Sequence, residues 1–213
     1  MRSVKRYTIF DTSDFTQAAF TVTAATDVIA STAHGLKVGD VIEVKTETTL
    51  PTGMSAATPY YVISVPTVNS FKVSATKGGT TINIEDTGTG THTWLKQGAG
   101  KAILVADYNN LTIGIDTDGG ADAAMTFKVV VSQEEECVDF DKAQSTTNSY
   151  SFAAINDLDD GTAKAGSDGV VVATADINKK YSVNTDSISW ITVKVSGRTE
   201  GEARVIISAT NNQ

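Results

Sequence analysis

Residues 34–44 read HGLKVGDVIEV, and this stretch decides how the chain is expected to fold. Gly35 and Gly39 permit the positive φ angles that a reversal of the chain needs, and Asp40 can hydrogen-bond to its own backbone. The alternation of residues 41–45 then predicts a β-strand with one apolar and one charged face. The stretch therefore predicts a tight turn that feeds a strand.

The same pattern of turn and strand repeats as far as Trp94. Leu50-Pro51-Thr52-Gly53 has the proline position of a β-turn, and Gly78-Gly79 predicts a hairpin between two alternating strands. The paired glycines of Gly88-Thr89-Gly90 predict a bulge before a last strand that returns to the sheet. The further strands expected in this region are 60–65, 71–76 and 81–85.

This ordered set of turns resembles a small β module that recurs in virion proteins of tailed bacteriophages. The residues that carry the resemblance, all between 34 and 93, are His-Gly-Leu, Gly-Asp, Leu-Pro-x-Gly, Tyr-Tyr-Val, Asn-Ser-Phe-x-Val-Ser, Gly-Gly and Gly-Thr-Gly-Thr-His-Thr. The module occurs in head, tail and fibre proteins alike. The resemblance therefore implies a structural protein of the virion without assigning its place on the particle.

Beyond Gln97-Gly98-Ala99-Gly100-Lys101, a glycine-rich boundary, the strands become longer. Eight or so strands with turn signals at near-regular spacing predict a two-sheet β-sandwich with jelly-roll or Greek-key connections. The fold class expected for the whole chain is all-β, with a small N-terminal β-barrel or sandwich module ahead of this domain. The expected parts are an N-terminal arm or edge strand (1–19), the small β module (20–97) and the β-sandwich (98–213).

Composition limits the classes of partner. A formal net charge of −8 and a pI of 4.7 argue against a nucleic-acid surface, which needs clustered Lys and Arg. No apolar run has the roughly 20 residues that cross a bilayer, and the N-terminus lacks the hydrophobic segment of a secretory signal. We therefore expect no nucleic acid and no membrane as partner, and assembly in the host cytoplasm.

The chemistry of a catalytic or metal site is poorly represented. His34 and His92 both lie in turns rich in Gly and Thr, where an imidazole can bond to the backbone. A single cysteine, Cys137, follows three glutamates that disfavour its thiolate, and two histidines with one cysteine make a zinc site implausible. We expect no enzyme activity, no cofactor and no metal.

Two clusters of carboxylates remain to be considered as calcium sites. Neither reproduces the spacing of a calcium-binding loop, so we expect solvated turn residues. The clusters are Asp116, Asp118 and Asp122, and Asp157, Asp159 and Asp160.

Contact surfaces are the features that the sequence can locate. Trp190 falls on the polar face of its strand, so it lies either under a loop or in an interface, and Ile206 and Tyr60 pose the same question. The first residues are locally basic through Arg2, Lys5 and Arg6. They form either an arm that pairs with a neighbouring subunit or an ordinary edge strand.

We expect a capsid decoration or cement protein, which is a minor capsid protein of the virion. It would stabilise the head by binding the major capsid protein or other virion proteins. We also expect a homo-oligomer, with a trimer favoured. A tail, tail-fibre or baseplate component is the first alternative. The second is an adhesin module that binds a host glycan through Trp190 or Tyr60.

Overall fold

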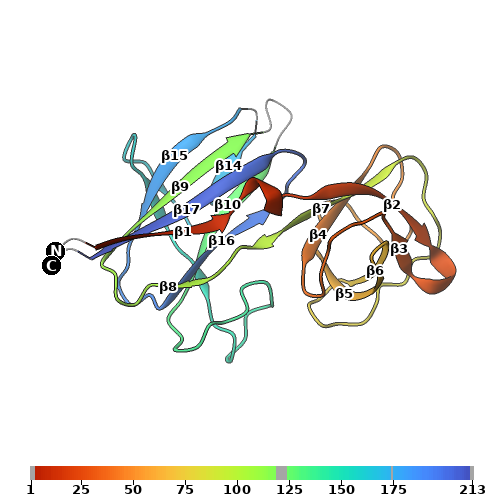
Figure 1. Cartoon of the computed structure of the whole chain (residues 1–213), viewed down its shortest axis with the longest axis horizontal. Coiled ribbons are helices and arrows are strands. Elements are labelled where there is room, and N and C mark those ends of the chain that lie inside the picture. The colour runs from red at the N-terminus through yellow and green to blue at the C-terminus, as the bar shows by residue number, and fades with distance from the viewer. Residues whose placement is uncertain (1–2, 119–123, 174, 212–213) are drawn as a thin grey trace. The chain divides into compact units, whose positions relative to one another are not determined.

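The computed structural model describes residues 3–118, 124–173 and 175–211, and within these ranges the all-β prediction is confirmed. Two 3-10 turns, Thr12–Asp14 and Ala24–Thr26, are the helical elements there. Contacts divide the chain into two compact units, one of residues 16–98 and one of residues 1–15 with 99–213 (Figure 1). The N-terminal segment thus groups with the second unit, whereas the predicted boundaries lay at residues 19/20 and 97/98.

Residues 16–98 form a closed six-stranded antiparallel barrel, in the order β7-β2-β3-β6-β5-β4 with β4 paired back to β7. The strands are β2 (Gln17–Thr23), β3 (Val28–Ala30), β4 (Val41–Thr46), β5 (Tyr60–Thr67), β6 (Ser70–Ser74) and β7 (His92–Ala99). Because the barrel is closed, each of its six strands pairs with a neighbour on both sides. The 34–44 stretch forms the predicted turn and strand, with Asp40 accepting from the Lys37 amide at 2.8 Å.

The barrel encloses its own apolar core. Trp94, 1% exposed, packs edge-on against Phe71, and its indole nitrogen donates to the Ser31 hydroxyl at 2.9 Å. The strand predicted at 81–85 is absent from the structure. Instead Ile84 enters the core while its amide donates to the Asp27 carboxylate and the Glu85 amide to the Thr52 carbonyl. Burial of one apolar residue therefore outweighed the alternating pattern of this segment.

The second unit is a sandwich of two antiparallel sheets. The first sheet has the order β1-β17-β9-β15-β12-β13; in the second, β10 lies between β16 on one side and β11 and β14 on the other, and β8 pairs with β16. The strands are β1 (Ser3–Phe10), β8 (Ile103–Leu104), β9 (Asn110–Asp118), β10 (Met125–Ser132), β11 (Ser151–Phe152), β12 (Ile155–Asp157), β13 (Ala163–Lys164), β14 (Val170–Val172), β15 (Asn178–Val183), β16 (Trp190–Ser196) and β17 (Glu202–Asn211).

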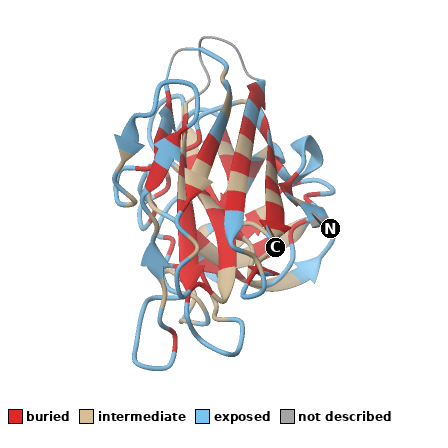
Figure 2. Cartoon of the chain, turned by 90° about the vertical axis from the view of Figure 1, so that its left-hand side faces the viewer, coloured by how far each residue is buried: buried red, intermediate tan, exposed pale blue. Residues whose placement is uncertain are grey.

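Period-two alternation builds the sandwich core. On β9 the buried residues are Leu111, Ile113, Ile115 and Thr117, and the residues between them lie on the outer face of the sheet. Buried and more exposed positions alternate in the same way along the neighbouring strands (Figure 2). Residue pairing places Ser3 opposite Asn211, so the described chain begins and ends on adjacent strands.

Candidate interaction surfaces

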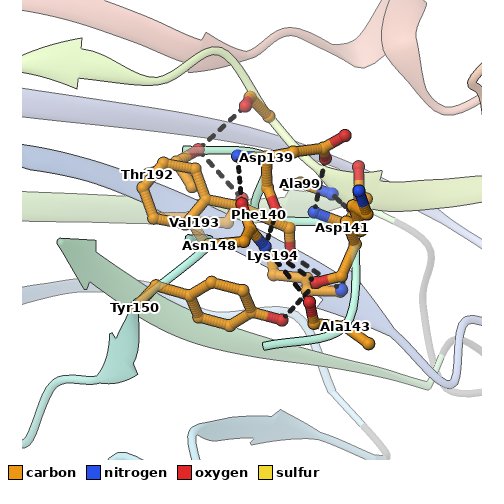
Figure 3. Close-up of polar contacts among 12 residues, drawn as sticks. Ala99, Asp139, Phe140, Asp141, Ala143, Asn148, Tyr150, Thr192, Val193 and Lys194 are labelled. Atoms are coloured by element: carbon orange, nitrogen blue, oxygen red, sulfur yellow. Dashed lines mark hydrogen bonds and ion pairs between the residues drawn. The ribbon is translucent and has the colours of Figure 1, made fainter. Parts of the chain in front are cut away.

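A long loop of residues 133–150 covers part of the outer face of the second sheet, and Asn148 holds it together (Figure 3). The side-chain Nδ2 atom of Asn148 donates to the Asp139 backbone carbonyl at 2.9 Å, and its Oδ1 atom accepts from the Asp139 backbone amide at 2.8 Å. The Nδ2 atom lies within reach of the carbonyls of Lys142 and Ala143 as well, at 3.4 and 3.3 Å. One buried side chain thus satisfies several backbone groups of a loop that has no strand partners.

An ion pair fastens the same loop to the sheet below it. Lys194 of β16 reaches the Asp141 carboxylate at 3.3 Å and the Phe140 carbonyl at 3.2 Å. The Asp141 carboxylate also accepts from the Ala99 amide at 2.9 Å, and the Phe140 ring is buried 5.7 Å from that of Tyr150 (Figure 3). Burial raises the pKa of the Tyr150 hydroxyl, which stays protonated and donates to the Lys142 carbonyl. The loop is therefore a fixed part of the surface.

Trp190 lies under this loop. Its side chain is half-buried, and the indole nitrogen donates to the Glu135 carbonyl at 3.2 Å. The glutamates 134–136 and Cys137 remain exposed beside it. Although the residue is exposed, partial desolvation of its sulfur atom, with a further contribution from the Asp139 carboxylate, raises the pKa of the Cys137 thiol, so this cysteine is protonated at neutral pH.

The other predicted contact residues lie in separate places. Tyr60 points into the barrel core, 3% exposed, and its hydroxyl accepts from the Ser55 amide at 2.8 Å, so it is no surface residue of this unit. Ile206 is half-buried on the outer face of the first sheet, opposite Gly114 and beside a shallow hollow of about 160 Å³. Trp190, Tyr60 and Ile206 therefore do not form one site.

Two of the basic residues near the N-terminus, Lys5 and Arg6, lie on β1, an edge strand that pairs with β17 on one side. Arg6 stands opposite Ser208 and so shares the outer face with Ile206, whereas Lys5 points to the other side. A hydrogen bond with Tyr108 raises the pKa of Lys5. Arg2 lies outside the described residues.

Both histidines are used to hold turns. The Nδ1 atom of His34 accepts from the Leu36 amide at 3.0 Å and its Nε2 atom donates to the Thr67 carbonyl at 3.3 Å. His92 contacts the Thr46 hydroxyl at 2.8 Å and donates through Nε2 to the Thr87 carbonyl at 3.0 Å. The ring nitrogens of each histidine are occupied by contacts within the barrel.

The carboxylate clusters do not form a metal site in the part of the chain that is described. Asp157 is bound by Lys179 at 2.7 Å and by the Asp159 amide at 3.0 Å, and the Lys179 ammonium lowers the pKa of Asp157. Asp160 caps the amide of Thr162 at 2.8 Å. Asp116 and Asp118 end β9, and Asp122 lies outside the described residues.

Sequence patterns did not reveal a cleft of about 750 Å³ on the barrel. Its lining comes from β2 (19–22), from the end of β3 with Thr32 and Asn69, and from the loop 87–92. The cleft exists because β2 changes partner: it pairs with β7 as far as Phe20 opposite His92 and with β3 from Thr21 onward. The loop instead pairs with residues 47–49, through bonds between Thr89 and Thr49.

The loop that forms one wall of this cleft, residues 87–91, has a fixed shape. Gly88 has φ +62°, and a Cβ there would lie 2.5 Å from the Thr49 carbonyl oxygen. The Asp86 carboxylate accepts from the Gly88 amide and the Thr52 amide, each at 2.9 Å, and from the Thr52 hydroxyl. These donors, the Thr52 hydroxyl first, lower the pKa of Asp86.

Comparison with known proteins gives little further information. No protein-family model matches the chain, and no curated protein matches it. It is similar to the crystal structure of SPBc2 prophage-derived protein YomS, with 11% identity over 54% of this chain and 82% of that chain and a TM-score of 0.38. A similarity at that level carries no argument about function. None of the helices in the described ranges has the length and apolar character needed to cross a membrane.

Proposed function

We propose that the chain is a structural protein of a tailed-bacteriophage virion that works through protein contacts and not through catalysis. The observation that carries this proposal is the order of turns between residues 34 and 93, which resembles the module of such proteins and here builds a closed barrel. Both histidines and the carboxylate of Asp157 support it further, because hydrogen bonds or an ion pair within their own unit occupy them.

Within that class we propose a capsid decoration protein that binds the major capsid protein. The surface we assign to this contact is the outer face of the first sheet, where half-buried Ile206 lies beside the hollow over Gly114 and exposed Arg6 and Arg204 flank it. A decoration protein acts in many copies, so each contact can be weak while the summed effect on the shell is large. A trimer would multiply this effect.

The test is binding of the purified chain to empty capsids of its own phage, with the rupture temperature of the capsids measured by light scattering. We expect saturable binding and a higher rupture temperature. Ile206→Asp should raise the Kd about tenfold, which corresponds to a loss of about 1.4 kcal/mol of binding free energy. Val171→Asp, at an exposed apolar position on the second sheet, is the matched control and should bind as the unchanged chain does.

Capsids that neither bind the protein nor change their rupture temperature would refute the decoration role. Gold labelling of whole virions would then distinguish the alternatives, since label on the tail, fibre or baseplate would place the protein there. Absence of label from the virion would refute the structural role altogether.

A further inference from the structure

We infer that the barrel cleft between β2 and the loop 87–92 is a binding site for a neutral saccharide. The cleft belongs to residues 16–98 alone, so this inference does not depend on where the protein sits on a virion. Its volume of about 750 Å³ lies within the range of about 300–1,000 Å³ that small-molecule sites occupy.

The lining of the cleft is uncharged. One fifth of the residues in the chain are charged, yet the lining contains no Asp, Glu, Lys or Arg. Its single ionisable side chain, His92, is held by Thr46 and by the Thr87 carbonyl. A phosphate, a carboxylate sugar or a basic peptide would find no opposite charge there, so the lining favours a ligand without formal charge.

Threonine hydroxyl and methyl groups contribute much of the cleft lining, and these two kinds of group match the surface of a sugar ring. Threonines dominate the lining, with Ala19 and Ala30 as small residues along β2 and β3; the threonines are Thr21, Thr32, Thr87, Thr89 and Thr91. Each threonine offers one O–H donor, two acceptor lone pairs and a methyl group. A saccharide presents hydroxyl groups around its rim and C–H groups on its faces, so both kinds of surface find a partner.

Asn69 supplies an oriented donor at one end of the cleft. Its Oδ1 atom accepts from the Ala33 amide at 2.8 Å, which fixes the plane of the side-chain amide. Its backbone carbonyl accepts from the Ser31 amide at 3.0 Å. No group of the described residues accepts a hydrogen bond from the Asn69 Nδ2 atom, so its two hydrogens are available to a sugar hydroxyl.

An extended peptide fits the cleft less well. The Ala19 carbonyl accepts from the Ser31 hydroxyl at 2.7 Å, so odd-numbered residues of β2 direct their backbone groups toward β3. The pairing of β2 with β7 ends at Phe20 and His92, and the next turn begins at Ala24. Between these two points, Val22 is the residue of β2 whose backbone N–H and C=O groups face the cleft. Strand addition needs a longer row of main-chain hydrogen bonds than this edge offers.

The experiment is a titration of the ¹⁵N-labelled full chain with neutral oligosaccharides, using hexamers of glucose, galactose, mannose and N-acetylglucosamine as probes. We expect at least one hexamer to bind saturably, with a Kd of about 1 mM or tighter. The amide shifts should concentrate at Thr21, Asn69 and Thr89. Polygalacturonate and an uncharged Thr/Val-rich peptide are the acidic and the peptide probes, and neither should bind.

Two variants and a matched control decide whether binding occurs in the cleft. Thr21→Arg fills the cleft and should abolish binding, whereas Thr23→Arg changes an exposed residue of the same strand and face that does not line it. Asn69→Asp keeps the acceptor for the Ala33 amide but removes the amide donors, and should weaken binding about tenfold with the melting temperature retained. Binding of no hexamer, equal binding by the Thr21 and Thr23 variants, or binding of the peptide instead would each overturn the inference.

Discussion

The barrel and the sandwich are both built from alternating strands, but they differ in how far apart their paired strands lie in the sequence. In the barrel, β5 and β6 pair across the short turn at Val68-Asn69, and the closing pair β4 and β7 lies within one unit of residues 16–98. In the sandwich, β1 pairs with β17 at the opposite end of the chain. Three of the six barrel pairings (β2–β3, β4–β5 and β5–β6) join strands that follow one another in the chain, whereas β3–β6, β4–β7 and β2–β7 are long-range. Turns between consecutive strands therefore specify more of the barrel than of the sandwich, whose described pairings join consecutive strands at β10–β11 and β12–β13.

The largest expected effects come from the two cores, which share no residue. Phe71→Ala in the barrel and Phe127→Ala in the sandwich each remove a fully buried ring, and each should lower the free energy of unfolding of its unit by about 3–5 kcal/mol. Trp94 reports on the barrel and Trp190 on the sandwich. Urea unfolding is therefore followed by the fluorescence of Trp94 in a Trp190→Phe background for the barrel, and of Trp190 in a Trp94→Phe background for the sandwich. If both tryptophans reported the same loss for either variant, the units would unfold as one.

Arg198 should be the most sensitive charged position of the sandwich. It is 4% exposed and donates to the carbonyls of Phe15 and Gly201, each at 2.8 Å, while its guanidinium lies over the Phe15 ring. Burial lowers its pKa to about 10, so it stays charged at neutral pH. Arg198→Ala should cost about 3 kcal/mol, because two carbonyls lose their donor.

The control for this prediction is Arg204→Ala on the exposed face of β17, which should change the free energy of unfolding by less than about 0.5 kcal/mol. Chemical unfolding followed by Trp190 fluorescence measures both variants. Equal effects of the two substitutions would show that burial of Arg198 does not determine its contribution.

How much of the fold the sequence predicts follows from the same contrast. The turn at Gly35 to Asp40 and the strand that follows it were predicted correctly, because a turn and a strand depend on residues that are neighbours in the chain. The strand predicted at 81–85 was wrong, since tertiary contacts of Ile84 and Glu85 with Asp27 and Thr52 replace the ladder. Sequence periodicity contains no information about such distant partners.

The candidate sites were predictable to a smaller degree. The position of Trp190 on the polar face was correct, but the sequence left open whether a loop covers it, and the Glu135 carbonyl gives the answer. The cleft was missed because it arises where β2 exchanges β7 for β3, and strand pairing is not visible in the residues of β2 themselves. A threonine-rich composition of the segments 19–32 and 87–91, in which Asp27 is the single charged residue, is the signal that could have indicated it.

Two glycines of the barrel test how strictly its turns are fixed. Gly53 has φ +99° and a Cβ there would lie 2.0 Å from the Asn83 carbonyl oxygen, whereas Gly35 has φ +65° and open space around it. Gly35→Ala should cost about 1 kcal/mol for the left-handed backbone alone. Gly53→Ala should cost about 2–3 kcal/mol, because the clash adds to that strain. Trp94 fluorescence during urea unfolding measures both, and equal costs would mean that the loop at Asn83 yields freely.

The smallest expected effects on stability concern two carboxylates, one in each unit, that hold a turn through different kinds of hydrogen-bond donor. Neutral donors led by the Thr52 hydroxyl lower the pKa of Asp86 in the barrel, and the Lys179 ammonium lowers the pKa of Asp157 in the sandwich. A lowered pKa in the folded state means that each carboxylate stabilises its unit fully above the ordinary carboxyl pKa. This stabilisation is lost as the pH falls through the lowered value. Asp86→Asn and Asp157→Asn should therefore each flatten the acid limb of the stability curve of their own unit.

Removing the partner should distinguish the two mechanisms. Lys179→Met should flatten the acid limb of the sandwich, because the Asp157 pKa then returns toward its ordinary value and the folded and unfolded states no longer differ in it, and should leave the barrel unchanged. Thr52→Val should do the same to the barrel alone, to a smaller extent, since the amides of Thr52 and Gly88 still bind Asp86. The free energy of unfolding at pH 7, 5 and 3, followed separately by Trp94 and Trp190 in the matching Trp→Phe backgrounds, measures these shifts. An acid limb of the sandwich that does not respond to Lys179→Met would mean that the Asp159 amide, and not the ion pair, holds Asp157 ionised, and the two units would then use the same neutral mechanism.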